Sequence, residues 1–197
     1  MKSFKVFSAN RQEIIEDTAK LIKKGKIIVF PTDTVYGLIC DATNKEAVSR
    51  LFIIKKRLKK KLIPIFVKDL KMAKELAEID KKQEKFLKSV WPGKVTVILK
   101  RKKVNIKLYG VSQKTIALRF LNYNLITDLF KKLNIPLVGT SANISGKQAT
   151  TKIKEVLKQF KSQKRKPDFI VDAENLKYSK PSIIIDLTFL KPKILRK

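Results

Sequence analysis

The chain has 197 residues, and its 46 lysines and arginines against 17 aspartates and glutamates give a formal net charge of +29 at pH 7. It has no histidine and only one cysteine, which excludes a Ser-His-Asp triad, a histidine zinc site and an internal disulfide bond. Hydrophobic residues make up 44% of the sequence, so the chain can bury a core and is predicted to fold despite its charge.

Length and composition predict one cytoplasmic domain over residues 1–197. Single domains commonly contain roughly 100–200 residues. The sequence shows no signal peptide, and it has no run of about 18 apolar residues that would predict a membrane-crossing helix. Cys40 is expected to be a small buried hydrophobic residue rather than a reactive thiol.

The positive charge alone does not identify a partner. A strongly basic domain favours phosphate-bearing partners such as nucleotides or nucleic acid. However, the chain has 39 lysines and only 7 arginines, spread almost evenly along it, whereas arginine is the typical reader of phosphates and base edges. A compositional bias and selection for nucleic-acid binding explain the charge equally well at this point.

Short apolar runs alternate with amphipathic stretches, which is the pattern of an α/β protein. Asn10 and Asn44 are predicted N-caps of two helices, the first over residues 10–24. Pro64 lies in a predicted strand and indicates a sheet edge or a bulge. The remaining elements expected in the first half are helices over 71–78 and 82–90 and strands over 26–30, 62–67 and 94–99.

The second half continues this alternation after a polar loop over residues 101–113. The patterns predict strands over 115–120, 135–139, 169–171, 182–187 and 194–196, and helices over 125–133 and 151–160. No internal repeat or low-complexity tract interrupts them. One mixed sheet with helices packed on it is therefore the expected fold.

Polar side chains follow the first predicted strand, at the kind of position where α/β proteins bind ligands. Residues 31–38, Pro-Thr-Asp-Thr-Val-Tyr-Gly-Leu, place two hydroxyls, a carboxylate and a phenol in one turn. An ordinary turn built on Asp and Thr is the simpler interpretation when spacing alone is considered.

Cations cluster where the second helix is expected to end, in Lys55-Lys56-Arg57 and the following Lys59, Lys60 and Lys61. Positive charges at a helix C-terminus offset its dipole by about 0.3–1 kcal/mol, which requires no ligand. In an extended segment, however, Lys55 and Arg57 would project to the same side and could clamp a polyphosphate.

Two later segments combine hydroxyl, amide and guanidinium groups. Ser141, Asn143 and Thr151 precede or begin a predicted helix, where such groups bind phosphate or carboxylate but also serve as ordinary N-caps. Thr115 and Arg119 lie four residues apart on one predicted strand and therefore face the same way. An arginine within an apolar strand requires an anionic partner if it is buried.

Taken together, in order and spacing, these segments resemble the landmarks of the YrdC family. The landmarks are F-P-T-D-T-V-Y-G-L, K-x-R, W-P-G-x-V-T, T-x-x-x-R, T-S-A-N-x-S-G, P-S-x-I-I-D and I-L-R. They extend from about residue 11 to residue 196, and within the family the chain is similar to the single-domain L-threonylcarbamoyladenylate synthases. Each landmark alone is weak, but the whole series in register is a specific signal.

The resemblance implies a twisted mixed β-sheet flanked by helices and curved around a basic cavity. It implies a nucleotidyltransferase that makes threonylcarbamoyl-AMP from L-threonine, bicarbonate and ATP and releases pyrophosphate. The product would feed the threonylcarbamoyl modification (t6A) of adenosine 37 in tRNAs that read codons beginning with A, through a downstream threonylcarbamoyl-transferase complex. Mg²⁺ is expected to arrive with ATP, and no protein-bound metal is implied.

Motif positions also imply the site residues. Those implied to bind L-threonine are Thr34, Arg119, Ser141 and Ser182. Those implied on the ATP side are Lys55, Arg57, Lys61, Thr115, Asn143, Thr151 and Arg196. The residues implied in catalysis are Lys55, Arg57, Ser141 and Asn143. Since the substrate's own carboxylate can attack the α-phosphate, the reaction needs fixed positive charge rather than an enzyme nucleophile.

The chain departs from the family pattern at three positions close to these site residues in sequence. Leu58 and Leu121 stand where relatives usually have proline, which loosens a loop without removing a ligand contact. Phe66 stands where some relatives carry a polar residue near threonine. The family pattern therefore does not define that edge of the amino-acid site in this chain.

Two alternative functions follow from the same resemblance. One is a non-catalytic RNA- or ribosome-binding module that uses the basic cavity, with tRNA as a partner. The other is the carbamoyl-adenylate chemistry of YrdC-like domains within hydrogenase-maturation proteins, which would require acylphosphatase and zinc-finger segments that this sequence does not contain. The combination of Thr34, Arg119 and Ser182 favours the enzyme, because an RNA-binding module would not need it.

Overall fold

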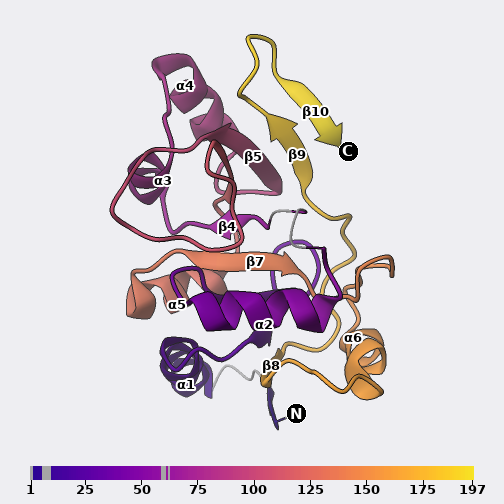
Figure 1. Ribbon diagram of the computed structural model, residues 1–197. Helices are drawn as coiled ribbons and strands as arrows, with labels where there is room; N and C mark the ends of the chain where they lie inside the picture. Colours follow the sequence, from indigo (N-terminus) through magenta and orange to yellow (C-terminus); the bar gives the residue numbers. More distant parts are fainter. Residues whose placement is uncertain (1, 6–9, 59–60, 62) are drawn as a thin grey trace.

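The computed structural model describes residues 2–5, 10–58, 61 and 63–197, in which ten strands form one mixed sheet and six helices pack against it (Figure 1). No helix within these residues is long and apolar enough to cross a membrane. The helices are α1 (Arg11–Lys23), α2 (Lys45–Lys55), α3 (Leu70–Leu76), α4 (Lys81–Val90), α5 (Asn124–Leu133) and α6 (Ile153–Lys161). The strands are β1 (Lys2–Lys5), β2 (Ile28–Phe30), β3 (Gly37–Asp41), β4 (Ile65–Phe66), β5 (Val95–Lys100), β6 (Thr115–Arg119), β7 (Leu137–Ser141), β8 (Phe169–Asp172), β9 (Ile183–Asp186) and β10 (Lys193–Arg196).

The sheet has the strand order β1-β8-β2-β3-β7-β4-β6-β5-β9-β10. Strands β1 and β2 each pair parallel with β8, and the pairs β4–β6 and β5–β9 are also parallel. The other neighbouring strands are antiparallel. The prediction of a mixed sheet with helices packed on it is therefore confirmed.

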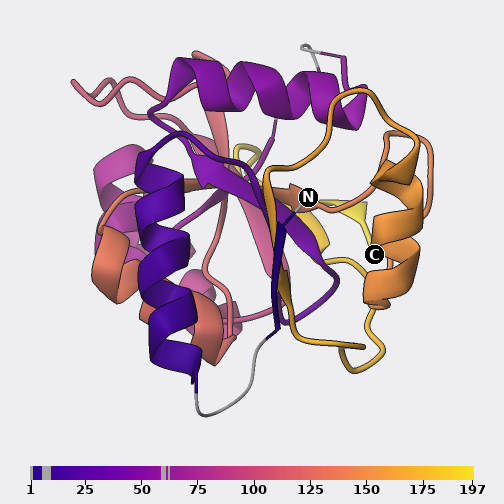
Figure 2. The ribbon, with the colours of Figure 1, turned by 90° about the horizontal axis from the view of Figure 1, so that it is seen from below.

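Strand β2 is covered on both faces, which explains why its sequence is continuously apolar rather than alternating. Ile28 and Phe30 pack with residues of α1 and α5, whereas Val29 packs with residues of α2. Figure 2 shows α1 beside α5, with α2 along a separate side of the molecule.

Helix ends follow the predicted capping pattern only in part. The Asn44 side chain accepts a hydrogen bond from the Ala47 N–H (2.9 Å) and caps α2 as predicted. Asn10 precedes α1, but its side chain makes no capping hydrogen bond, so that part of the prediction is wrong. Asp69 and Asp80 cap α3 and α4, as is typical of aspartate at this position.

The strands of the structure differ from the prediction in three places. The turn expected over residues 31–38 is shorter than predicted, because β3 already begins at Gly37 and pairs antiparallel with β2. Strand β4 contains only Ile65 and Phe66, and the predicted start at Leu62 lies outside the described residues. Strand β1 corresponds to no predicted element. Cys40 of β3 is fully buried, as predicted.

Strands β5 and β6 separate the core from the predicted site residues. Val97 and Leu118 point to one face and join the core. Thr96, Thr115 and Arg119 occupy the alternate positions and line a cavity on the other face. The prediction that Thr115 and Arg119 point to the same face is therefore correct. One face of these two strands packs against the core, and the other lines the cavity.

Candidate active site

A cavity of about 260 Å³ lies against the face of the sheet that carries Thr115 and Arg119. Its wall is formed by the loop after β2, by strands β5, β6 and β7, by the segment that follows α2, and by residues from 181 to the end of β10. Among the described residues that line it, the charged ones are Arg57, Arg119 and Arg196. A concave site with this lining suits an anionic ligand.

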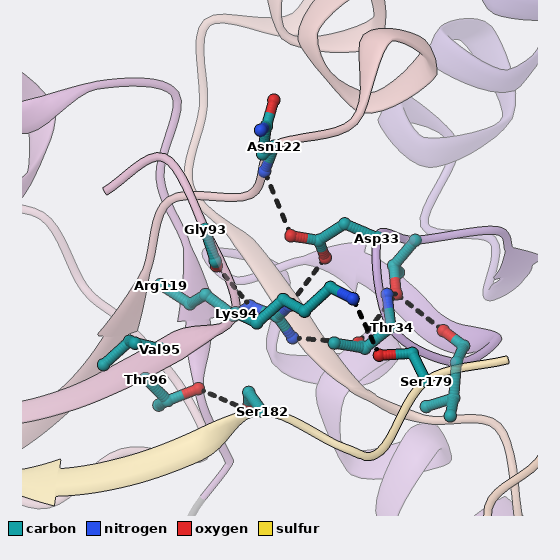
Figure 3. A network of polar contacts seen from close by, with 12 residues as sticks. Asp33, Thr34, Gly93, Lys94, Val95, Thr96, Arg119, Asn122, Ser179 and Ser182 are labelled. Carbon is teal, nitrogen blue, oxygen red and sulfur yellow. Dashed lines mark hydrogen bonds and ion pairs between the residues drawn. The ribbon is translucent and has the colours of Figure 1, made fainter. Parts of the chain in front are cut away.

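Arg119 is the centre of a buried polar network (Figure 3). Its Nε donates to the carbonyl of Gly93 (3.2 Å), its Nη1 to Thr34 Oγ1 (3.2 Å) and its Nη2 to the carboxylate of Asp33 (2.6 Å). The second Asp33 oxygen accepts the backbone N–H of Asn122 (3.1 Å). Burial lowers the pKa of Arg119, and the Asp33 carboxylate partly offsets this effect. These bonds use three of the five guanidinium N–H groups, which leaves two for a ligand carboxylate.

The Trp-Pro-Gly segment supplies one of these contacts. Gly93 follows α4, and its carbonyl accepts the Arg119 Nε hydrogen. A Cβ at this position would lie 2.6 Å from the backbone oxygen of Val90. Glycine is therefore required for the close turn that places this carbonyl beside Arg119.

Thr34 presents an acceptor to the cavity, because its own proton is already used. The Thr32 hydroxyl donates to the carbonyl of Val35 (2.6 Å). The two threonine hydroxyls are 3.1 Å apart, so in that contact Thr34 must be the donor. Thr34 Oγ1 also accepts from Arg119. One lone pair remains, and it can accept an N–H or O–H of a ligand.

Ser182 and Arg196 form another part of the wall. The Ser182 Oγ lies 2.9 Å from Thr96 Oγ1. Arg196 donates to the Ser182 carbonyl through Nε (2.9 Å) and Nη2 (2.7 Å), and Nη2 also donates to Ser182 Oγ (3.1 Å). Partial burial lowers the pKa of Arg196. Strand β10 thus fixes a guanidinium beside the hydroxyls of Thr96 in β5 and of Ser182, which directly precedes β9.

Arg57 reaches the cavity from the segment after α2, but Lys55 does not. Helix α2 continues to Lys55, and Lys56 then adopts a left-handed conformation (φ 50°), so the extended arrangement of Lys55 and Arg57 is wrong. Arg57 lines the cavity, and its Nε donates to the carbonyl of the exposed Lys61 (2.7 Å). Two lysines of the predicted cluster, Lys59 and Lys60, lie outside the described residues.

Lys55 instead holds the loop that follows β7. Its Nζ donates to the carbonyls of Ser141 (2.6 Å) and Asn143 (2.9 Å) and to Asn143 Oδ1 (3.2 Å). Ser141 Oγ also donates to Asn143 Oδ1 (2.6 Å). The side chain of Lys55 is buried, and the three acceptors match the three donors of an ammonium group. Lys55 therefore fixes the loop that presents Ser141 to the cavity.

This burial predicts a pH effect on stability. Burial, and to a smaller extent Arg57, lowers the pKa of Lys55 to about 7. The pKa of a lysine in the unfolded chain is about 10.4. Between about pH 7 and this value, the unfolded chain therefore binds more protons at Lys55 than the folded chain does. The contribution of Lys55 to the free energy of unfolding should therefore rise by about 2–3 kcal/mol between about pH 7 and about pH 9.5.

Urea unfolding of the wild type and of Lys55→Met at both pH values would measure this contribution. The Met variant has no titrating group at this position, so the difference between the two proteins isolates Lys55. An equal pH dependence in both proteins would contradict the prediction.

The structure brings seven of the predicted site residues into the cavity wall: Thr34, Arg57, Thr115, Arg119, Ser141, Ser182 and Arg196. Four others lie outside its lining. Lys55 and Asn143 support the Ser141 loop, and Lys61 contacts Arg57 through its carbonyl. Thr151 is half-buried where the chain approaches α6, and its carbonyl accepts the N–H of Leu176 (3.0 Å).

Sequence reasoning assigned no role to Asp33 or Thr96. Asp33 lies between two threonines of the Pro-Thr-Asp-Thr segment, and the expected need of a buried Arg119 for an anion was the signal that could have identified it.

The departure from the family pattern at Phe66 also has a structural counterpart. Its ring packs over Gly139, where a Cβ would approach the ring carbons to 2.2 Å. Phe66 and Gly139 therefore shape one side of the cavity together.

Comparison with known proteins gives the same family along nearly the whole chain. The family model Sua5/YciO/YrdC, described as telomere recombination, matches residues 20–197. A Methanocaldococcus jannaschii relative is 34% identical over 189 residues, which are 94% of this chain and 87% of the relative. The threonylcarbamoyl-AMP synthase of Pyrococcus abyssi is 32% identical over 193 residues, which are 95% of this chain and 56% of that protein. The chain thus spans little more than half of the P. abyssi relative.

Solved structures agree with this assignment. P. abyssi Sua5 complexed with L-threonine has a TM-score of 0.86 at 30% identity, covering 99% of this chain and 56% of that one. Escherichia coli YciO has a TM-score of 0.86 at 26% identity, covering 100% of this chain and 96% of that one. Because the family model covers most of the sequence and the fold agrees along its full length, the chain belongs to the Sua5/YciO/YrdC family.

Proposed function

We propose that this chain is an ATP-dependent synthase of threonylcarbamoyl-AMP, which it makes from L-threonine and bicarbonate with release of pyrophosphate. The observation that carries the proposal is a single cavity in which Arg119, already held by hydroxyl and carboxylate partners, lies on the same wall as Arg57 and Arg196. Relatives from P. abyssi and Pseudoalteromonas translucida, at 32% and 35% identity, are named threonylcarbamoyl-AMP synthases.

The end of the cavity at Arg119 suits L-threonine. The two remaining N–H groups of Arg119 can bind the substrate carboxylate, and the free lone pair of Thr34 can accept a hydrogen from its amino group. Ser141 and Ser182 supply further hydroxyl groups on the same cavity wall. A related protein of 30% identity has been solved with L-threonine, which supports this placement.

Arg57, Thr115 and Arg196 line the same cavity, and their positive charges and hydroxyl group suit the phosphates of ATP. Lys55 and Asn143 contribute by fixing the Ser141 loop, and Lys61 contributes by holding Arg57. The placement of Thr151 on the ATP side stays a prediction from its motif position. Within the described residues, no cluster of three or more Cys, Asp or Glu could hold a metal ion. We expect Mg²⁺ to arrive on the phosphates of ATP, whose charge it would reduce.

This arrangement fits a reaction that needs positioning more than acid-base chemistry. The threonine amine attacks the carbon of bicarbonate, and loss of water gives the carbamate. A carbamate oxygen then attacks the α-phosphate of ATP, and the bond between the α-phosphorus and the bridging oxygen breaks to release pyrophosphate. Arg57 and Arg196 would stabilise the negative charge that develops on this leaving group. Arg119 and Thr34 would hold the amino acid in line for attack.

Under this proposal the product supplies the threonylcarbamoyl group of t6A at position 37 of tRNAs that read codons beginning with A. A threonylcarbamoyl-transferase complex would consume it, since the mixed anhydride is an activated acyl donor. tRNA is then the final acceptor, and the cytoplasm is the compartment where all these substrates meet. The many exposed lysines need no separate function in this account.

One experiment tests the proposal directly. The purified chain is incubated with ATP, bicarbonate and labelled L-threonine, and pyrophosphate and a threonylcarbamoyl adenylate are measured together. We expect both products to depend on all three substrates. If no adenylate forms under conditions in which a relative is active, while the chain binds tRNA tightly, the non-catalytic RNA-binding alternative would be favoured instead.

A further inference from the structure

Two arginines on the same cavity wall have different charge partners. Arg119 forms an ion pair with Asp33 (2.6 Å), and both side chains are only 6% exposed. Arg196 donates to the carbonyl and hydroxyl of Ser182, which are neutral, and no carboxylate among the described residues pairs with it. The arginine proposed to bind the amino acid is thus paired with a carboxylate, and Arg196, proposed to bind phosphate, is not.

We infer that Asp33 determines specificity by cancelling the positive charge of Arg119, so that the amino-acid site accepts a zwitterion in preference to an anion. The inference rests on the proposed function, in which Arg119 binds the carboxylate of L-threonine. Asp33 does not line the cavity and acts through Arg119.

The charge balance makes this role necessary. Arg196 lies near enough to Arg119 for its positive charge to act on that guanidinium. Without Asp33, two positive charges would face the cavity together and attract any anion, including a phosphate group of ATP or the released pyrophosphate. With Asp33 in place, the carboxylate of a zwitterion can still accept hydrogen bonds from Arg119, while its ammonium group meets one positive charge fewer than it would without Asp33.

The second oxygen of Asp33 explains why this carboxylate stays in position. It accepts the backbone N–H of Asn122, directly after β6, while the first oxygen accepts from Arg119 at the end of β6. The carboxylate is therefore bound at both oxygens without any ligand. A substrate carboxylate that displaced it would have to replace both of these hydrogen bonds.

The test compares two ligands that differ by one charge. L-Threonine is a zwitterion near neutral pH, and its hydroxy-acid analogue, in which a hydroxyl replaces the amino group, is an anion. The dissociation constants of both are measured by calorimetry, and the analogue is also tested as an inhibitor competitive with L-threonine. In Asp33→Asn we expect the ratio of the two affinities to shift at least about tenfold toward the anion. Loss of folded protein would lower the binding capacity without moving this ratio.

A matched control is available elsewhere in the fold. Asp168 pairs with Arg50 (2.8 Å), and neither residue lines the cavity. Asp168→Asn removes a carboxylate from another aspartate–arginine pair, which is more exposed, and should leave the ratio unchanged. An unchanged ratio in Asp33→Asn, or an equal shift in both variants, would overturn the inference.

A measurement on the wild type covers the case in which Asp33→Asn does not fold because Arg119 is left as an unpaired buried charge. With Asp33 in place, we expect the hydroxy-acid analogue to bind more weakly than L-threonine. Equal or tighter binding of the anion by the wild type would overturn the inference. If the wild type neither binds L-threonine nor forms the adenylate, the proposed function fails. If the wild type does both and the ratio does not move, only the role of Asp33 fails.

Discussion

Arg119→Lys should reduce kcat/KM for L-threonine by about 100-fold to 1000-fold, equivalent to ~3–4 kcal/mol. The guanidinium reaches Gly93, Thr34 and Asp33 through three different N–H groups and still has two left for the substrate. A lysine ammonium has three hydrogens on one nitrogen and no planar fork, so it cannot make these contacts and also bind a carboxylate bidentately.

Steady-state pyrophosphate release, with L-threonine and ATP varied separately, would measure this loss. We expect most of it in the KM for L-threonine and little in the KM for ATP. Arg50→Lys is the matched control, because Arg50 pairs with Asp168 away from the cavity. A variant that retains wild-type use of L-threonine would show that Arg119 does not bind the amino acid.

Arg57→Ala should reduce kcat/KM for ATP by about 100-fold while changing the free energy of unfolding by less than about 1 kcal/mol. Arg57 lines the cavity from a segment that lies outside any helix or strand, so truncation removes a phosphate contact without opening the core. The loss should appear with ATP and pyrophosphate, whereas the KM for L-threonine should stay close to that of the wild type.

Lys56→Gly is the control for this prediction. Lys56 is the adjacent cation, and its positive φ of 50° suits glycine, so the substitution removes one charge without straining the chain. Kinetics for both substrates and chemical denaturation should be compared for the two variants. Normal ATP use in Arg57→Ala, or an equal loss in Lys56→Gly, would place the phosphate site elsewhere.

Much of the fold was predictable because the periodicity of its apolar residues is simple. The apolar run ending at Phe30 correctly identified a strand, and the spacing of Thr115 and Arg119 correctly identified a strand and their shared face. Strand β3 was not predicted, because its apolar residues follow directly on a polar turn and its role depends on pairing with β2 and the distant β7. Strand register is set by partners that a local pattern does not contain.

The site was predictable only as a set of residue types. Spacing placed Lys55 and Arg57 on one side of an extended segment, but the helix continues to Lys55 and turns its ammonium toward the Ser141 loop. Asp33 was present in a recognised segment without an assigned role, since its partner Arg119 is 86 residues away. Burial and long-range pairing decide which charges face a ligand, and neither can be read from local sequence.

The long separation of these partners has a consequence for synthesis of the chain. Asp33 with Arg119, Lys55 with Ser141, and Thr96 with Ser182 each join residues 86 positions apart. A nascent chain on the ribosome therefore cannot assemble the amino-acid end of the cavity until β9 has emerged and paired with β5. Arg196 of β10 joins the cavity wall last, so under the proposed function binding of nucleotide should begin only when folding is nearly complete.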